Sequence, residues 1–213
     1  MGTERMSELF LPPELSCEIA EIYETMATSY DEVASQIALS CEGCPDNCCD
    51  SYFQHYTYSE WAYLWEGIRA LEDEQLDRIM ERARSYVEES GRILAQGERP
   101  QLKCPLVEDG LCGLYKHRLM ICRTHGVPAT LTRPDGQHLR FPGCFRCQEI
   151  VEDRYAVETD APAMERTILY RRLAQLESRF LGSVRHLYPK LKLTIAEMIV
   201  NGPPKDIKTC LKK

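Results

Sequence analysis

The chain has 213 residues, a formal net charge of −7 and eleven cysteines. A chain of this length can bury enough apolar surface to fold without disulfides. The negative charge argues against general nucleic-acid binding, which needs a basic face. The longest apolar runs fall far short of the roughly 18 residues that span a bilayer, and MGTERMSELFLPPE lacks the pattern of a secretion signal. We therefore expect a cytoplasmic protein that binds neither nucleic acid nor membrane.

The hydrophobic pattern predicts a mainly α protein of the α+β class, with helices flanking a cysteine-rich loop region and one or two short hairpins. Residues 12–39 carry apolar side chains at spacings of three and four, which indicates an amphipathic helix. SYFQHYTYSEW suggests a short strand, after which Thr57 and Glu60 form a capping-box pattern that opens a helix through Ile68. A further helix is predicted from about Glu74 to Gln96.

Residues 97–149 are rich in Gly, Pro and Cys and show little helical period. Within them VPATLT and QHLRF flank RPDG, whose Pro, Asp and Gly favour a hairpin turn. The helical period returns at 162–187. We therefore predict one domain over 1–213, in which flanking helices at 12–39 and 160–188 enclose a metal-binding core at 41–147.

Cysteine enrichment in a reducing compartment indicates metal binding or catalysis rather than disulfides. Two Cys-x2-Cys pairs occur, and this spacing lets two thiolates converge on one ion from a tight turn. Cys17 and Cys210 are isolated, and we expect both to be bystanders, Cys17 as a small buried hydrophobe in the first helix. The predicted metal ligands are Cys41, Cys44, Cys48, Cys49, Cys104, Cys112, Cys122, Cys144 and Cys147.

Cys48 and Cys49 are adjacent, so their side chains leave the backbone in different directions. Either they serve two metal centres, or one binds metal while the other packs or reacts. Nine thiols would suit two four-ligand sites with one thiol to spare.

The segment from Arg99 to Cys147 holds eight Lys or Arg against three acids, about +5, although the whole chain is at −7. Cations near thiolates stabilise the negative charge of a cysteine-ligated centre. The arginines in question are Arg118, Arg123, Arg140 and Arg146, which could equally be ordinary surface residues. His125 could bind metal directly or hydrogen-bond to a ligand.

CEGCPDNCC followed by CPLVEDGLCGLYKHRLMICRTHGVP resembles the CxxCxxCC family, the zinc- or iron-chelating domain of YkgJ-like proteins. The resemblance covers about residues 41–147 and implies that the nine cysteines named above bind metal. Two departures put the geometry in question: three residues precede the double Cys, and Arg118-Leu119 stands where many relatives have Arg-Pro. Some relatives were grouped with flagellin lysine N-methylase, but no glycine-rich turn suited to S-adenosylmethionine occurs here.

Three functions follow from these observations. The first is an iron–sulfur protein with a redox or protein-modification role and a redox or protein partner. The second is a structural zinc module that presents its surface to a partner protein. The third is a modifying enzyme in which Cys49 or Cys112 is the reactive thiol. The sequence does not decide between iron and zinc.

Overall fold

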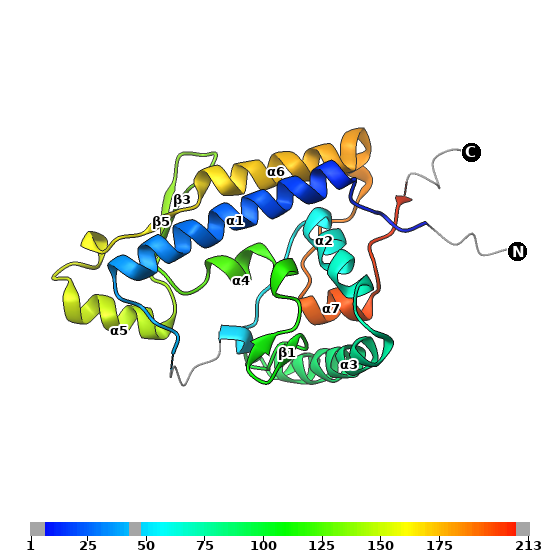
Figure 1. The fold of residues 1–213 in the computed structure, drawn as a ribbon, viewed down its shortest axis with the longest axis horizontal. Helices are drawn as coiled ribbons and strands as arrows, with labels where there is room; N and C mark the ends of the chain where they lie inside the picture. The colour runs from blue at the N-terminus through cyan, green and yellow to red at the C-terminus, as the bar shows by residue number, and fades with distance from the viewer. Residues whose placement is uncertain (1–6, 43–47, 208–213) are drawn as a thin grey trace, which may run out of the picture. The chain divides into compact units, whose positions relative to one another are not determined.

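The computed structural model describes residues 7–42 and 48–207 (Figure 1). Within them most residues are helical and the strands form two small sheets, which confirms the predicted mainly α, α+β fold class. The chain divides into two compact units. Unit 1 comprises Met1–Ser16, Cys49–Leu119 and Leu176–Lys213, and unit 2 comprises Cys17–Cys48 and Met120–Gln175. Helices α1 (Pro13–Gln36) and α6 (Thr167–Leu181) contribute residues to both, and the single domain stays a prediction.

Unit 1 is built around three helices and a short hairpin. Its elements include α2 (Tyr58–Arg69), α3 (Asp73–Ala95), β1 (Val107–Glu108), β2 (Leu111–Cys112), η2 (Tyr115–His117), η4 (Gly182–Leu187) and α7 (Ile195–Val200). Helix α3 packs against α7. The indole nitrogens of Trp61 and Trp65, one turn apart on α2, both donate to the carbonyl of Met198 at 3.1 and 3.0 Å. Both bonds use a carbonyl of the kind that the end of a helix leaves without an intrahelical partner.

Helix α2 begins where the sequence predicts. The Thr57 hydroxyl oxygen accepts from the Glu60 backbone N–H at 3.3 Å, and the hydroxyl donates to the Glu60 carboxylate at 2.8 Å. The Tyr58 and Ser59 N–H groups donate to the two carboxylate oxygens of Glu177, at 2.9 and 2.8 Å. Glu177 is 4% exposed, so a buried carboxylate from the end of α6 caps the helix.

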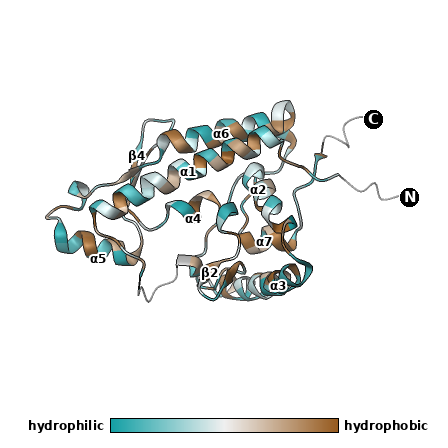
Figure 2. Cartoon of the chain, in the orientation of Figure 1, coloured by the Kyte–Doolittle hydropathy of each residue, from teal (hydrophilic) through white to brown (hydrophobic). Residues whose placement is uncertain are grey.

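Unit 2 contains a three-stranded sheet and two helices besides most of α1 and α6. Its elements are α4 (Met120–Thr124), β3 (Ala129–Thr132), β4 (His138–Phe141), α5 (Phe145–Arg154), η3 (Glu158–Asp160) and β5 (Met164–Glu165). Strand β3 pairs antiparallel with β4 and parallel with β5. The β3–β4 hairpin turns through RPDG as predicted, with Gly136 at φ +86°. Figure 2 shows hydrophobic and hydrophilic residues along α1 and α6, as expected of amphipathic helices.

Several predicted elements differ from the structure. In the described stretch 51–56, Ser51 and His55 form isolated bridges with Gln101 and Leu193 in place of a strand. The helix predicted at 162–187 begins only at Thr167, because residues 164–165 pair with β3, and it changes to the 3-10 helix η4 at Gly182. Helices α5 and α7 were not predicted, since each is too short for a clear period. No described helix is long and apolar enough to cross a membrane.

Candidate metal centres

The boundary between the two units falls between the adjacent cysteines Cys48 and Cys49. This boundary and the one after Leu119 separate the predicted ligands into two sets. We call Cys49, Cys104 and Cys112 of unit 1 the hairpin group. We call Cys41, Cys122, Cys144 and Cys147 of unit 2 the helix group. Cys44 lies outside the described residues, and Cys48 is described only as the first residue of η1 (Cys48–Asp50).

Backbone hydrogen bonds bring the hairpin group together. The Cys104 N–H donates to the Cys49 carbonyl at 2.9 Å, which joins two segments 55 positions apart in the chain. A turn follows in which the Val107 N–H donates to the Cys104 carbonyl at 3.0 Å. Val107 in turn pairs with Cys112 across the β1–β2 hairpin. All three cysteines therefore lie at the base of this hairpin, and each is half-buried.

The hairpin turn has the Asp-Gly pair that is typical of tight two-residue loops. Asp109 and Gly110 both have positive φ, +49° and +81°, and Asp-Gly is favoured where both central residues of a turn need this conformation. The turn sets the register that places Cys112 opposite Val107. Helix α3 contacts the hairpin through ion pairs: Arg78 Nε and Arg82 Nη1 lie 3.5 and 3.6 Å from Glu108 Oε1.

Some charges near Cys49 raise the pKa of its thiol and others lower it. Burial raises the pKa of the Cys49 thiol, Cys112 and Asp50 raise it further, and Arg118 and Lys103 oppose the increase. Asp50 Oδ1 is buried and has no hydrogen-bond partner within the described part of the chain. A buried carboxylate oxygen without a donor is costly. A bound cation at the hairpin group would compensate it.

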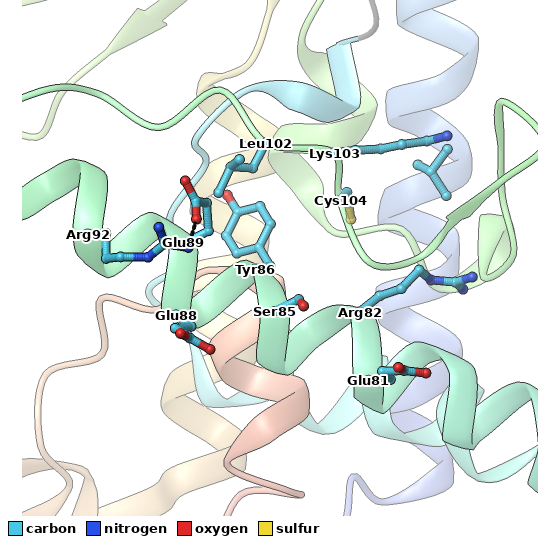
Figure 3. A pocket seen from close by; sticks show the side chains of 11 residues that line it. Glu81, Arg82, Ser85, Tyr86, Glu88, Glu89, Arg92, Leu102, Lys103 and Cys104 are labelled. Atoms are coloured by element: carbon cyan, nitrogen blue, oxygen red, sulfur yellow. Dashed lines mark hydrogen bonds and ion pairs between the residues drawn. The ribbon is translucent and has the colours of Figure 1, made fainter.

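A pocket of about 570 Å³ lies beside the hairpin group in unit 1. Figure 3 shows the side chains of Tyr86 and Cys104 in the space between α3 and the segment that leads to β1. Burial, followed by the charge that Cys104 can carry, raises the pKa of Tyr86 to about 12. The pocket makes Cys104 accessible from one side.

Three members of the helix group lie on or beside the helices α4 and α5. Cys122 lies within α4, Cys144 is the N-cap residue of α5, and Cys147 lies in its first turn. The Cys144 N–H donates to the Gly126 carbonyl at 3.0 Å, which holds the start of α5 against the segment after α4. Cys147 is fully buried, and burial followed by Cys144 raises the pKa of its thiol to about 12.

Gly143 allows this close packing. It has φ +90°, and a Cβ there would lie 2.5 Å from the Gly126 carbonyl oxygen and 2.8 Å from Cys147 Sγ. Real Cβ atoms do not approach backbone so closely, and positive φ also disfavours other residues. Only glycine therefore fits immediately before Cys144.

Cys41 is connected to the helix group through its neighbour. Arg146, which lies between Cys144 and Cys147 in the sequence, donates from Nη1 to the Glu42 carbonyl at 3.0 Å. Cys41 itself is exposed. Glu42, the residue after Cys41, is thus hydrogen-bonded to a residue within the second Cys-x2-Cys pair.

The other predicted site residues have mixed outcomes. Arg118 lowers the pKa of the Cys49 thiol, against the larger effect of burial. Arg123 lies over the Tyr23 ring at 4.6 Å, and Arg140 donates to the carbonyls of Glu158 and Ala161, so these two hold the local fold. His125 follows α4 and is half-buried. Cys17 lies on α1 as predicted, but it is exposed rather than buried, because its position falls on the outer face between the buried Leu15 and Ile19.

Sequence reasoning missed Asp50 and Gly143. Asp50 directly follows the double Cys, and Gly143 directly precedes the second Cys-x2-Cys pair, so proximity was the available signal. Among the described residues, no three His, Cys, Asp or Glu side chains lie close enough together to hold an ion.

No protein-family model, curated protein or solved structure matches this chain. The resemblance to the CxxCxxCC family accordingly stays an expectation drawn from the motif.

Proposed function

We propose that this protein binds metal through two separate cysteine groups and that the bound species is an iron–sulfur cluster. Such clusters carry electrons, and the role we propose is a redox step or a protein modification, with a protein or redox partner, in the cytosol where thiols stay reduced. The chain's own residues would supply the thiolates, the surrounding positive charge and the shielding from water.

The hairpin group carries this proposal. Three cysteines lie on backbone segments that come together at one hairpin although Cys49 is far from the other two in sequence, and the direct link is the 2.9 Å bond from the Cys104 N–H to the Cys49 carbonyl. Soft thiolates are the donors that zinc and iron–sulfur clusters prefer. The buried Asp50 Oδ1, which has no hydrogen-bond partner in the described region, adds an oxygen donor next to Cys49.

The division of the ligands supports two centres rather than one. Cys48 and Cys49 cannot easily reach the same ion, and the unit boundary between them assigns them to different groups. At the hairpin group the ligands would be Cys49, Cys104 and Cys112, with the carboxylate of the adjacent Asp50 as a fourth donor. The helix group has Cys41, Cys122, Cys144 and Cys147, with Cys44 as a further predicted donor.

Zinc is the alternative occupant, and one observation favours it. Strands β1 and β2 have two residues each and α4 has five, so both groups lie in short elements of the kind that a structural zinc ion organises. A nucleophilic role for Cys49 has less support. Reactive thiols have a lowered pKa, whereas burial raises the pKa of Cys49.

The test is to purify the full chain anaerobically, record its visible spectrum and measure iron, zinc and acid-labile sulfide per chain. The proposal expects brown protein with matching iron and sulfide. Colourless protein with zinc and no sulfide would replace the cluster by a structural zinc module. Protein with neither metal nor sulfide, and no uptake on reconstitution, would overturn metal binding altogether.

A further inference from the structure

A second pocket of unit 1, of about 700 Å³, contains none of the cysteines. Its lining comes from the residues around the start of α2 and from residues between Glu177 of α6 and Leu191, a stretch that continues to Leu193. Two backbone bonds join these segments: the His55 N–H donates to the Leu193 carbonyl at 2.7 Å, and the Leu193 N–H donates to the His55 carbonyl at 3.1 Å. A volume of this size is typical of sites for small molecules.

The pocket is basic in a chain that is acidic overall. Between Glu177 and Glu197 the sequence has four Lys or Arg residues and no acid. Arg185, His186 and Lys190 line the pocket and are exposed. Glu177 also lines it, but its two carboxylate oxygens accept the N–H groups at the start of α2. The local field therefore favours an anion.

The base of the pocket is rigid. The Tyr58 hydroxyl donates to the Pro189 carbonyl at 3.1 Å, and the Tyr188 hydroxyl donates to Asp206 Oδ1 at 3.1 Å. The two rings meet edge to face with centroids 4.9 Å apart. Both tyrosines are buried, so the segment that carries Pro189 and Lys190 is fixed in place.

Tyr56 supplies an aromatic surface at the same pocket. Its side chain is 61% exposed although it lies between the buried His55 and the N-cap Thr57. Leu191, which is half-buried, and Pro189 add apolar area beside it. An exposed aromatic ring beside cations provides stacking area together with charge, which are the two elements that recognise a base and its phosphate.

We propose that this pocket binds a small aromatic compound carrying a phosphate, of the nucleoside monophosphate type. Arg185 and Lys190 would bind the phosphate, because a guanidinium pairs with two phosphate oxygens and an ammonium adds a point charge. The planar ring would stack on Tyr56. Two permanent cations match a doubly charged phosphate better than a singly charged carboxylate. This site is independent of the metal centres proposed above.

The test is calorimetric titration of the full chain with AMP, compared with adenosine and with inorganic phosphate. AMP should bind more tightly than either part alone. The double variant Arg185→Gln with Lys190→Gln, and separately Tyr56→Ala, should each weaken AMP binding by about tenfold or more. Phenyl phosphate serves as a second probe, and binding equal to that of AMP would support the site while widening the ligand class to aryl phosphates.

The control variant is Arg84→Gln, which removes an exposed arginine of α3 outside the pocket and should leave AMP affinity unchanged. Thermal unfolding should show that all variants are folded, which the exposure of the substituted side chains predicts. The proposal is overturned if AMP and phenyl phosphate fail to bind at millimolar concentration, or if the pocket variants bind them as well as the native chain. Replacing Cys49 and Cys112 by alanine should not alter AMP binding. A failure of the phosphate-pocket proposal can therefore be distinguished from a failure of the metal proposal.

Discussion

The two cysteine groups are held in different ways. The cysteines of the hairpin group are half-buried and lie on the 3-10 helix η1, a turn and a two-residue strand, which backbone hydrogen bonds join. In the helix group, Cys147 is fully buried, and the glycine before Cys144 leaves no room for a Cβ. The hairpin group can therefore adjust around what it binds, whereas the helix group depends on close packing. We therefore expect each group to lose stability and bound metal in response to a different kind of substitution.

The largest effect should come from Gly143→Ala. The new Cβ meets the Gly126 carbonyl at 2.5 Å and Cys147 Sγ at 2.8 Å, and overpacking together with positive-φ strain costs about 3 kcal/mol. We expect the free energy of unfolding to fall by about that amount in urea titrations. Metal bound by the helix group should be lost, while metal bound by the hairpin group is retained.

The matched control is Gly136→Ala, at φ +86° in the β3–β4 turn with nothing within 4 Å of the added Cβ. It carries the backbone strain without the clash, so it should cost only about 1 kcal/mol. If the two substitutions lowered the free energy of unfolding equally, close packing around Cys147 would not be what sets the helix group apart from the hairpin group.

Low pH should lower the stability of unit 1 because of the buried His55. This side chain is 3% exposed, burial lowers its pKa although Glu60 opposes the decrease, and Nε2 has no hydrogen-bond partner among the described residues. A lowered folded pKa means that stability is complete above the unfolded pKa of about 6.5 and falls as pH decreases below it. One proton limits the slope to about 1.4 kcal/mol per pH unit.

Trp fluorescence can measure this effect in unit 1, because both tryptophans of the chain lie on α2. The urea midpoint should fall between pH 7 and pH 5 in the native chain and fall less in His55→Phe, which cannot titrate at this position. Neither of these two histidines of unit 2 is buried as His55 is: His125 is half-buried and His138 is exposed. An identical pH dependence of the two proteins would rule out His55 as the cause.

Gly110→Ala should have a smaller effect and should act on the hairpin group. Its φ is +81° and nothing lies within 4 Å of the added Cβ, so the cost is strain alone, about 1 kcal/mol. We expect a modest loss of stability by urea titration and weaker metal retention by the hairpin group only. Loss of metal from the helix group in this variant would contradict their separation.

The smallest effect should follow Arg118→Gln, which removes the larger of the two cationic contributions that lower the pKa of Cys49, the other being Lys103. Because Arg118 is half-buried, the expected change is only about 0.5 kcal/mol. Competition with a chelator should show slightly faster metal loss from the hairpin group. The control is Arg123→Gln, whose guanidinium lies over Tyr23 in unit 2 and which should leave the hairpin group unchanged.

The long helices and one hairpin were predictable because their signals are local. The helices predicted at 12–39 and 74–96 appear as Pro13–Gln36 and Asp73–Ala95, since apolar spacing fixes a buried face over several turns. Thr57 and RPDG set a helix start and a turn through their own side chains and backbone preferences. The start of α6 was not predictable, because β5 forms only through pairing with distant β3.

The grouping of the cysteines depends on tertiary structure. Spacing alone places Cys49 with Cys41 and Cys44, whereas in the fold the Cys49 carbonyl accepts a hydrogen bond from the Cys104 N–H. The one local signal was the Cys48-Cys49 pair, which predicts divergent side chains. Gly143 could not be identified from the sequence as essential, because its neighbours Gly126 and Val127 lie sixteen or more positions earlier in the chain.

The most direct test of two separate cysteine centres is the metal and sulfide content per chain in three variants prepared alike. These are Cys49→Ala with Cys112→Ala, Cys144→Ala with Cys147→Ala, and the control Cys17→Ala on the exposed face of α1. We predict that each double variant loses the metal of one group and retains the other, while the control equals the native chain. If either double variant loses all its metal, or neither loses any, two separate cysteine centres are contradicted.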